Sequence, residues 1–357
     1  MKSLKKILAA LMAIMLAFSL AACKEEPKEI PPAGTTEIGM GSLKIGMLYT
    51  STPVEIPEDD AEKAEEIKEN APLDVNYAHR NAIDTMRNYI SVSKENIIEA
   101  NGLSATDAEA FKEKIKELVK AGCQVIIATS NDYLSLIEEV AAEEAYFSIV
   151  FMVYAGNSAT EAPQIKNTNN NIMLFGADMF EAAYLSGIAA AMKAKEAKKN
   201  TIGYVATAEK TNAEVTASVN AFALGAQSVN KKAEVKVSVV KDWTNEEAVD
   251  SAVKALEDAK CANVSKFVET DEDAFCATVW HLENAYISIL TKISRGEWTP
   301  ENYFGGITEG VADVKLGEDA AEGTKDAIRE AKDEIMANGL TLDAEAGSYV
   351  KGVSLLK

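Results

Sequence analysis

The sequence predicts an α/β fold of two lobes joined by a hinge, each lobe built on a doubly wound parallel sheet. Its 357 residues suit two domains of ordinary size. From Leu43 onward, short apolar runs alternate with amphipathic stretches, a rhythm typical of βα units in parallel sheets. The polar stretch 156–171 interrupts the rhythm, which then restarts, so we expect a crossover or hinge there.

The first lobe is expected over residues 43–155, completed by about 280–308. Apolar runs of strand length and apolar residues at helical spacing define its elements. The predicted strands are 43–49, 124–129 and 147–154, and the predicted helices are 76–90, 108–120 and 132–144.

The second lobe is expected over residues 156–279, completed by about 309–357. Its predicted strands are 172–177, 201–206 and 234–240, and its predicted helices are 179–194, 211–229 and 245–260. The tail continues the alternation with helices at 282–295 and 318–338 and extended segments at 310–316 and 349–356.

Composition excludes several classes of function. The formal net charge is −20, and a field of that sign repels phosphate backbones, so we expect no nucleic-acid partner. The chain has only two histidines, His79 and His281, which argues against a histidine-rich metal site and a Ser-His-Asp triad. Calcium loops, glycine-rich phosphate loops and nucleophile elbows do not occur in the sequence. We therefore expect no metal, no cofactor, no catalytic residue and no enzymatic activity.

The N-terminus carries an export signal. Three lysines precede an apolar run over 7–20, and small residues follow it, which predicts a signal peptide over 1–22. The segment 20–23 resembles a bacterial lipobox, which implies lipidation of Cys23 and location at the extracytoplasmic face of the cell membrane. An uncleaved anchor helix, or a free cysteine beside an ordinary cleavage site, is the alternative. Prolines and a glycine make residues 23–42 a predicted flexible tether. Whether Cys261 and Cys276 pair is left open.

Several segments together resemble one known family over about residues 44–313. They are 77–79, 128–130 with Tyr133, 180–187, 202–206, 220–226, 279–280 and 305–306. The chain is similar here to the basic membrane protein family of solute-binding lipoproteins, which serve ABC importers and include purine-nucleoside receptors. The resemblance implies a periplasmic-binding-protein-like fold of type I, a buried small-molecule solute and ABC permease subunits as partners.

The sequence also departs from the family pattern. The loop after the first strand, 55–70, is long and acidic, and Val75 stands where the family has an aromatic residue that stacks on a base. Asn131 and Asp132 stand where family members often carry Gly and Phe. Only residues 261–278 lie between the helix at 245–260 and the Val-Trp segment, so the second lobe is expected to be shortened by about one βα unit.

Ten residues are candidates for contact with a solute, because they follow strand ends or begin helices, where α/β sheets bind ligands. They are Asn76, Tyr77, His79, Ser130, Asn131, Tyr133, Met179, Phe180, Trp243 and Trp280. Tyrosine and tryptophan rings can stack on a base, and amide, hydroxyl and imidazole groups can hydrogen-bond to it or to a sugar.

Each candidate also has a plain structural interpretation. Tyr77 and His79 could be half-buried helix residues, and Ser130 or Asn131 could cap the next helix. Met179 and Phe180 could form a hydrophobic staple. Trp280 could pack the hinge, whereas Trp243 in a polar loop is better explained by a ligand.

The sequence thus predicts an exported binding protein that takes a small polar aromatic solute, a purine nucleoside or nucleobase, by closure of two lobes. An exported enzyme is a second hypothesis, disfavoured by the two histidines. A surface or sensory lipoprotein that kept the fold but lost the solute site is the third, supported by Val75 and the shortened lobe.

Overall fold

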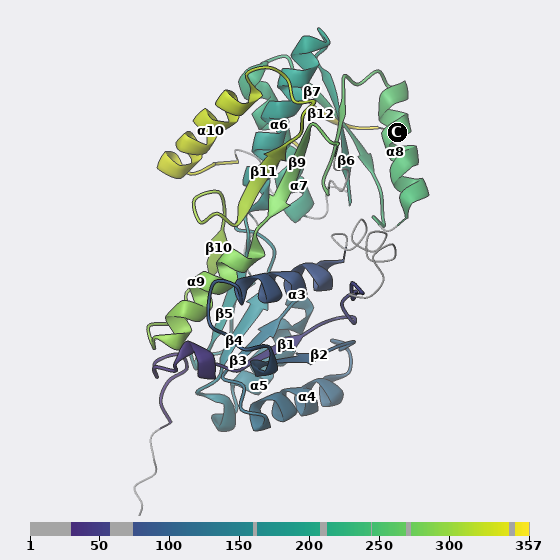
Figure 1. The fold of residues 1–357 in the computed structure, drawn as a ribbon. Coiled ribbons are helices and arrows are strands. Elements are labelled where there is room, and N and C mark those ends of the chain that lie inside the picture. Colours follow the sequence, from purple (N-terminus) through teal and green to yellow (C-terminus); the bar gives the residue numbers. More distant parts are fainter. Residues whose placement is uncertain are drawn as a thin grey trace, which may run out of the picture. The chain divides into compact units, whose positions relative to one another are not determined.

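The computed structural model describes residues 30–57, 74–159, 163–207, 213–243, 245–268, 273–342 and 347–356 (Figure 1). Residues 32–357 form one compact unit. The predicted signal peptide and Cys23 lie outside the described residues. In the described part of the chain, no helix has both the length and the apolar character needed to cross a membrane.

The first lobe is built on six parallel strands in the order β10-β5-β4-β3-β1-β2. These strands are β1 (Ile45–Leu48), β2 (Ile97–Ala100), β3 (Val125–Ala128), β4 (Val150–Tyr154), β5 (Ile172–Ala177) and β10 (Tyr303–Gly305). Helices α3 (Val75–Met86) and α9 (Leu282–Ser294) cover one face, and α4 (Ala108–Lys120) and α5 (Leu134–Ala141) cover the other. Burial on both faces explains why the strands are apolar throughout instead of alternating with polar residues.

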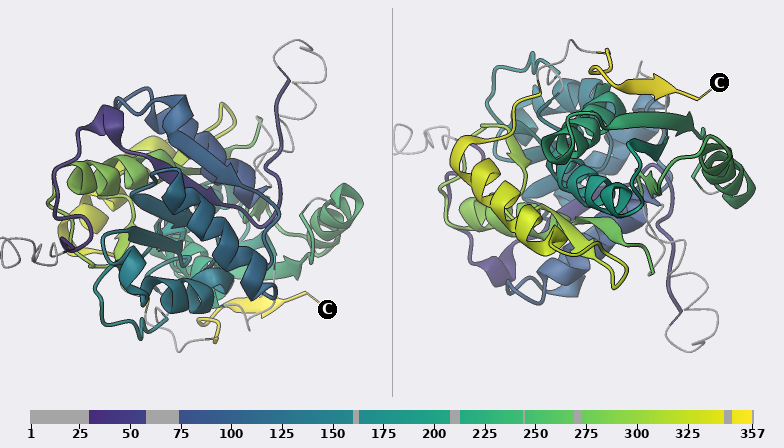
Figure 2. Two further views of the ribbon diagram at one scale, coloured as in Figure 1. Left: turned by 90° about the horizontal axis from the view of Figure 1, so that it is seen from below. Right: turned by 90° about the horizontal axis from the view of Figure 1, so that it is seen from above.

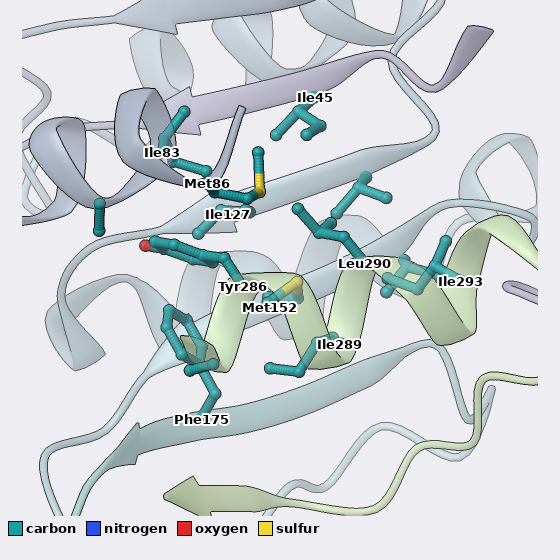
Figure 3. Close-up of a cluster of buried hydrophobic side chains, with 14 of the residues drawn as sticks. Ile45, Ile83, Met86, Ile127, Met152, Phe175, Tyr286, Ile289, Leu290 and Ile293 are labelled. Atoms are coloured by element: carbon teal, nitrogen blue, oxygen red, sulfur yellow. The ribbon is translucent and has the colours of Figure 1, made fainter. Parts of the chain in front are cut away.

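The alternation of side chains divides this lobe into two cores. Ile45, Ile127 and Met152 point toward α3 and α9, where they meet Tyr286 and Leu290 (Figure 3). Their neighbours in the strands point the other way, toward α4 and α5. The sheet is therefore held between two apolar layers, which fixes its register and the positions of the loops at its carboxyl end.

The second lobe has a smaller parallel sheet in the order β12-β7-β6-β8, with β6 (Thr201–Ala206), β7 (Glu234–Val239), β8 (Val264–Lys266) and β12 (Val353–Leu355). An antiparallel pair, β9 (Cys276–Trp280) and β11 (Ala312–Leu316), lies beside it. Helix α8 (Glu246–Asp258) lies on one side of the sheet, and α6 (Met179–Glu196), α7 (Ala213–Val229) and α10 (Thr324–Asn338) lie on the other (Figures 1 and 2). In the described residues this sheet has four strands against six in the first lobe.

Helices α6 and α7 contain the two family-like segments 180–187 and 220–226, and they pack against each other through glycines. A Cβ atom on Gly187 would lie 2.0 Å from the Phe222 carbonyl oxygen, and one on Gly225 would lie 2.0 Å from the Tyr184 carbonyl oxygen. Only glycine permits this backbone approach, so the pattern shared with the family is in this part a helix-packing pattern.

The predicted lobe boundary at residue 156 is wrong. Strand β5 pairs with β4, with Phe151 opposite Ile172, and therefore belongs to the first lobe. The polar stretch before it is a loop within that lobe, and the chain first crosses between β5 and α6. It crosses again between β9 and α9 and between β10 and β11. An apolar run predicts a strand but not the sheet to which the strand belongs, because sheet membership depends on non-local pairing.

The predicted flexible tether over 23–42 is also wrong for its second half. Ala33 is buried, and the Ile38 amide donates a hydrogen bond to the Ser294 carbonyl oxygen at 2.8 Å. Gly34 lies directly against the Trp298 ring, where a Cβ atom would come within 2.8 Å. Proline and glycine favour irregular backbone, and here that backbone covers an apolar surface at the end of α9. Cys123 and Cys261 are buried free thiols, so no disulfide joins Cys261 to Cys276.

Candidate functional site

Asn76 joins the loops that follow β1 and β3 at the carboxyl end of the first sheet. Its side-chain oxygen accepts hydrogen bonds from the Thr50 amide at 3.3 Å and from the Thr129 hydroxyl at 3.2 Å. Its side-chain NH₂ donates to the Ser51 hydroxyl at 2.7 Å. The Asp74 carboxylate caps α3 by accepting from the Asn76 amide. The side-chain amide of Asn76 is buried and already hydrogen-bonded to both loops, so Asn76 positions these loops. Thr50 and Ser51 remain exposed.

Five rings meet at the crossover between the lobes, and we call them the aromatic cluster. They are His79, Tyr154, Phe175, Trp280 and Tyr286. The His79 imidazole is fully buried, and its Nδ1 lies 2.6 Å from the Tyr286 hydroxyl. Burial lowers the pKa of His79 to about 3, so the imidazole is neutral.

Tyr154 and Trp280 are the half-buried members of the aromatic cluster. Tyr154 ends β4 in the first lobe and Trp280 ends β9 in the second, and their ring centroids lie 5.8 Å apart at 46°. His79 packs edge-on against Tyr154 at 4.9 Å and against Trp280 at 5.8 Å. The indole Nε1 of Trp280 is buried and no described residue accepts its hydrogen bond. His79 thus supports two rings that come from different lobes.

Glu214, in the first turn of α7, brings a carboxylate from the second lobe to the end of β4. A Cβ atom on Gly156 would lie 3.1 Å from its Oε2. Burial raises the pKa of Glu214 above its ordinary value. Burial also raises the pKa of the Tyr154 phenol, and the Glu214 charge adds to that rise. Neither residue is among the ten candidates expected from the sequence. Tyr154 lies at the end of a predicted strand, as several of the candidates do, and could have been selected on that ground. Nothing in the sequence distinguishes Glu214 from the many other acidic residues on helices.

Three further carboxylates, Asp178, Glu181 and Glu309, lie on the connections between the lobes, and we call them the crossover carboxylates. Asp178 accepts hydrogen bonds from the Ser158 amide and hydroxyl, each at 2.7 Å. Glu181 accepts from the Ile307 amide at 2.7 Å, and Glu309 accepts from the Gly306 amide at 2.9 Å. Burial raises the pKa of Glu181 to about 7, although the bond from Ile307 opposes the rise. These bonds hold the crossover segments in place.

Among the remaining predicted site residues, several lie in packing or capping positions. The Ser130 hydroxyl accepts from the Asp132 amide at 3.2 Å, which is its alternative role as a cap, and Asn131 is exposed beside it. Tyr133 is fully buried against Phe111, with its hydroxyl donating to the Leu103 carbonyl oxygen at 2.8 Å. A phenol in this position cannot reach a solute unless the core repacks.

The other aromatic and apolar candidates divide in the same way. Tyr77 is half-buried beside Asn76, and Met179 is half-buried between two core clusters. Phe180 is buried in the α6–α7 core, and Trp243 packs against the cluster under α8. The structure therefore brings His79 and Trp280 into direct contact and places Asn76 on the same helix, but Tyr133, Phe180 and Trp243 lie in separate clusters. The described residues hold no group of three His, Cys, Asp or Glu side chains able to bind a metal.

Several solved structures share this fold, among them solute-binding proteins of ABC transporters. An ABC transporter solute-binding protein from Conexibacter woesei superposes with a TM-score of 0.60 at 13% identity, covering 84% of this chain and 98% of that one. One from Aeropyrum pernix superposes with a TM-score of 0.57 at 11% identity, covering 84% of this chain and 92% of that one. Identities this low show the shared fold, the periplasmic-binding-protein fold of type I, and nothing finer.

Sequence relatives add the family. A putative ABC transporter glucose-binding protein, TsgA13, from Haloferax volcanii is 25% identical over 81% of this chain and 74% of its own. A purine-binding protein from Brucella abortus is 28% identical over 60% of this chain and 51% of its own. The model of the family described as "ABC transporter substrate-binding protein PnrA-like" matches residues 76–339, most of the chain. The chain therefore belongs to this family, the substrate-binding proteins that serve ABC transporters.

Proposed function

We propose that this substrate-binding protein takes a purine nucleoside or nucleobase between its two lobes. The observation that carries the proposal is the pair of half-buried rings, Tyr154 and Trp280, one from each lobe and 5.8 Å apart at the carboxyl end of the first sheet. Aromatic faces are the usual partners of bases, and stacking tolerates any base. The purine-binding relative supports the same ligand class.

Recognition in this proposal needs no covalent chemistry. A base stacks on the exposed surface of Tyr154 and Trp280. Ser51 in the loop after β1, Tyr77 in the first turn of α3 and Asn131 in the short helical turn after β3 are hydrogen-bonding groups for a sugar or base edge. A solute that contacts both lobes binds the closed arrangement more tightly and shifts the population toward it. The permease of the transporter then receives the solute from the closed form.

We further propose that the mature protein begins at Cys23 and is held at the extracytoplasmic membrane surface by acyl chains on that residue. The signal-like segment and the Cys at its end support the proposal. Replacing Cys23 by Ala should move the protein from the membrane fraction to the soluble exported fraction. Intact mass of the wild-type protein should show loss of residues 1–22 and added lipid; a protein that keeps its first 22 residues contradicts this.

Calorimetry on the exported chain tests the ligand class. The panel is adenosine, guanosine, inosine, hypoxanthine and glucose, with glucose included because of the glucose-binding relative. A purine at one hundred times its Kd should stabilise the fold by about 2.7 kcal/mol. Trp280→Ala should weaken purine binding by about 10- to 100-fold, the range expected for one stacked base.

Trp243→Ala is the matched control, since Trp243 packs in a separate cluster under α8. Equal losses in both tryptophan variants would contradict stacking on Trp280. Binding of glucose alone would replace the purine proposal by a sugar-binding one. Silence across the panel would favour a lipoprotein that has kept the fold without the solute site.

A further inference from the structure

We propose that Glu214 determines the specificity of the solute site: it accepts hydrogen bonds from N–H or O–H groups of the solute and excludes solutes that carry a phosphate or carboxylate. The inference rests on the function proposed above and deepens it. It assigns a role to a residue that lies outside the ten predicted candidates.

The first step is the position of Glu214. It belongs to the second lobe, yet its carboxylate lies against the backbone of Gly156 in the first, two residues beyond the half-buried Tyr154. Gly156 has a φ of 79°, a conformation that favours glycine, and a side chain there would approach the Glu214 Oε2 to 3.1 Å. The first lobe thus leaves room for a carboxylate from the second.

The second step concerns the partners of Glu214 among the described residues. No described residue forms a hydrogen bond or ion pair with the Glu214 carboxylate, and burial disfavours its charge. The helix dipole stabilises an acid in the first turn of a helix, whether the acid is exposed or buried. The dipole therefore does not explain why Glu214 is buried against the other lobe. A carboxylate held in this way is available to accept hydrogen bonds from a solute.

The third step is the chemistry around it. The buried indole N–H of Trp280 also lacks an acceptor among the described residues. Trp280 contacts Tyr154, and the Glu214 charge helps to raise the pKa of the Tyr154 phenol. The crossover carboxylates Asp178 and Glu309 lie on the adjoining connections and add negative charge, while Glu181, whose pKa burial raises to about 7, is only partly charged near neutral pH. The ring faces of Tyr154 and Trp280, with the Glu214 carboxylate as a hydrogen-bond acceptor, suit a base or nucleoside that carries amino, ring N–H or hydroxyl donors. The same charges repel a phosphate.

The experiment compares guanosine and adenosine with their 5′-monophosphates by calorimetry. Wild-type protein should bind the nucleosides at least about 100-fold more tightly than the monophosphates. Glu214→Gln should weaken nucleoside binding by about 10- to 100-fold, the range for one hydrogen bond to a charged group, and should weaken monophosphate binding less, because repulsion is also removed. Glu247→Gln, an exposed acid in the first turn of α8, is the matched control and should leave both affinities unchanged.

A second readout needs no ligand. Because Glu214 is largely buried and has no partner among the described residues, Glu214→Gln should raise the melting temperature of the ligand-free protein, whereas removal of a structural acid would lower it. Nucleoside affinity that is unchanged in Glu214→Gln, a lowered melting temperature, or monophosphates bound as tightly as nucleosides would each overturn the inference while leaving the proposed function intact. A wild-type protein that binds no nucleoside would overturn both.

Discussion

The buried imidazole of His79 should make the protein less stable in mild acid. In the folded chain the pKa of His79 lies near 3, against 6.5 for an exposed histidine, because burial disfavours the charged ring. Between pH 6.5 and 3 the imidazole is therefore protonated in the unfolded chain but stays neutral in the folded chain. The contribution to stability is fully present above pH 6.5 and is lost as the pH falls toward 3.

The size of the loss follows from these two values. At about pH 5 the unfolded histidine is almost fully protonated while the folded one is neutral, so unfolding is favoured by about 2 kcal/mol relative to pH 7.5. Below the folded pKa the loss would reach about 5 kcal/mol. Other groups titrate over the same range, so the prediction concerns the difference between wild-type protein and a variant that lacks only this imidazole.

His79→Gln is the variant of choice, because glutamine does not titrate and still offers hydrogen-bonding groups to the Tyr286 hydroxyl. Urea unfolding at pH 7.5 and at pH 5 should show that wild-type protein loses about 2 kcal/mol more than His79→Gln between the two conditions. Since the chain has two histidines, proton NMR can also follow each ring, with His281→Gln supplying the assignment. A His79 resonance that titrates between pH 6 and 7, or equal losses in the two proteins, would refute the reasoning.

Two further predictions concern the second lobe and the crossover. Gly187→Ala should destabilise the fold by about 3 kcal/mol, the upper end of the usual cost of overpacking, because the new methyl group would overlap the Phe222 carbonyl oxygen. Gly39→Ala, which meets no atom within 4 Å, should be tolerated. Denaturant unfolding checks both variants, and equal effects would contradict close helix packing. Burial raises the pKa of Glu181 from 4.5 to about 7, so its stabilising contribution is present below pH 4.5 and is lost as the pH rises through 7. The unfolding free energy of wild-type protein relative to Glu181→Gln should therefore fall between pH 4.5 and 7; a flat difference would show that the two states bind the proton equally.

Local pattern was enough to locate most of the elements. The predicted strands at 172–177 and 201–206 coincide with β5 and β6, and the predicted helix at 108–120 coincides with α4. Buried parallel strands and amphipathic helices have sequence periods that can be read residue by residue. The short strands β2, β8 and β10 were missed, because three or four residues at or near the edge of a sheet carry too little periodicity to be recognised.

The candidate site depended on contacts that no local pattern encodes. Strand-end reasoning selected Trp280 and His79, which do meet, but it also selected Tyr133 and Phe180, which are core residues. A ring at the end of a strand can point into the core or away from it, and the direction depends on which helix packs there.

By itself, the sequence determined the two-lobed α/β class and the membership of a solute-binding family, because periodicity, motif spacing and composition are local properties. Only the tertiary structure decided that β5 belongs to the first lobe and that the Glu214 carboxylate lies against Gly156. Both features form where the chain crosses between the sheets and brings distant segments together. They are stabilised by non-local strand pairing and burial, which a linear pattern of residues does not specify.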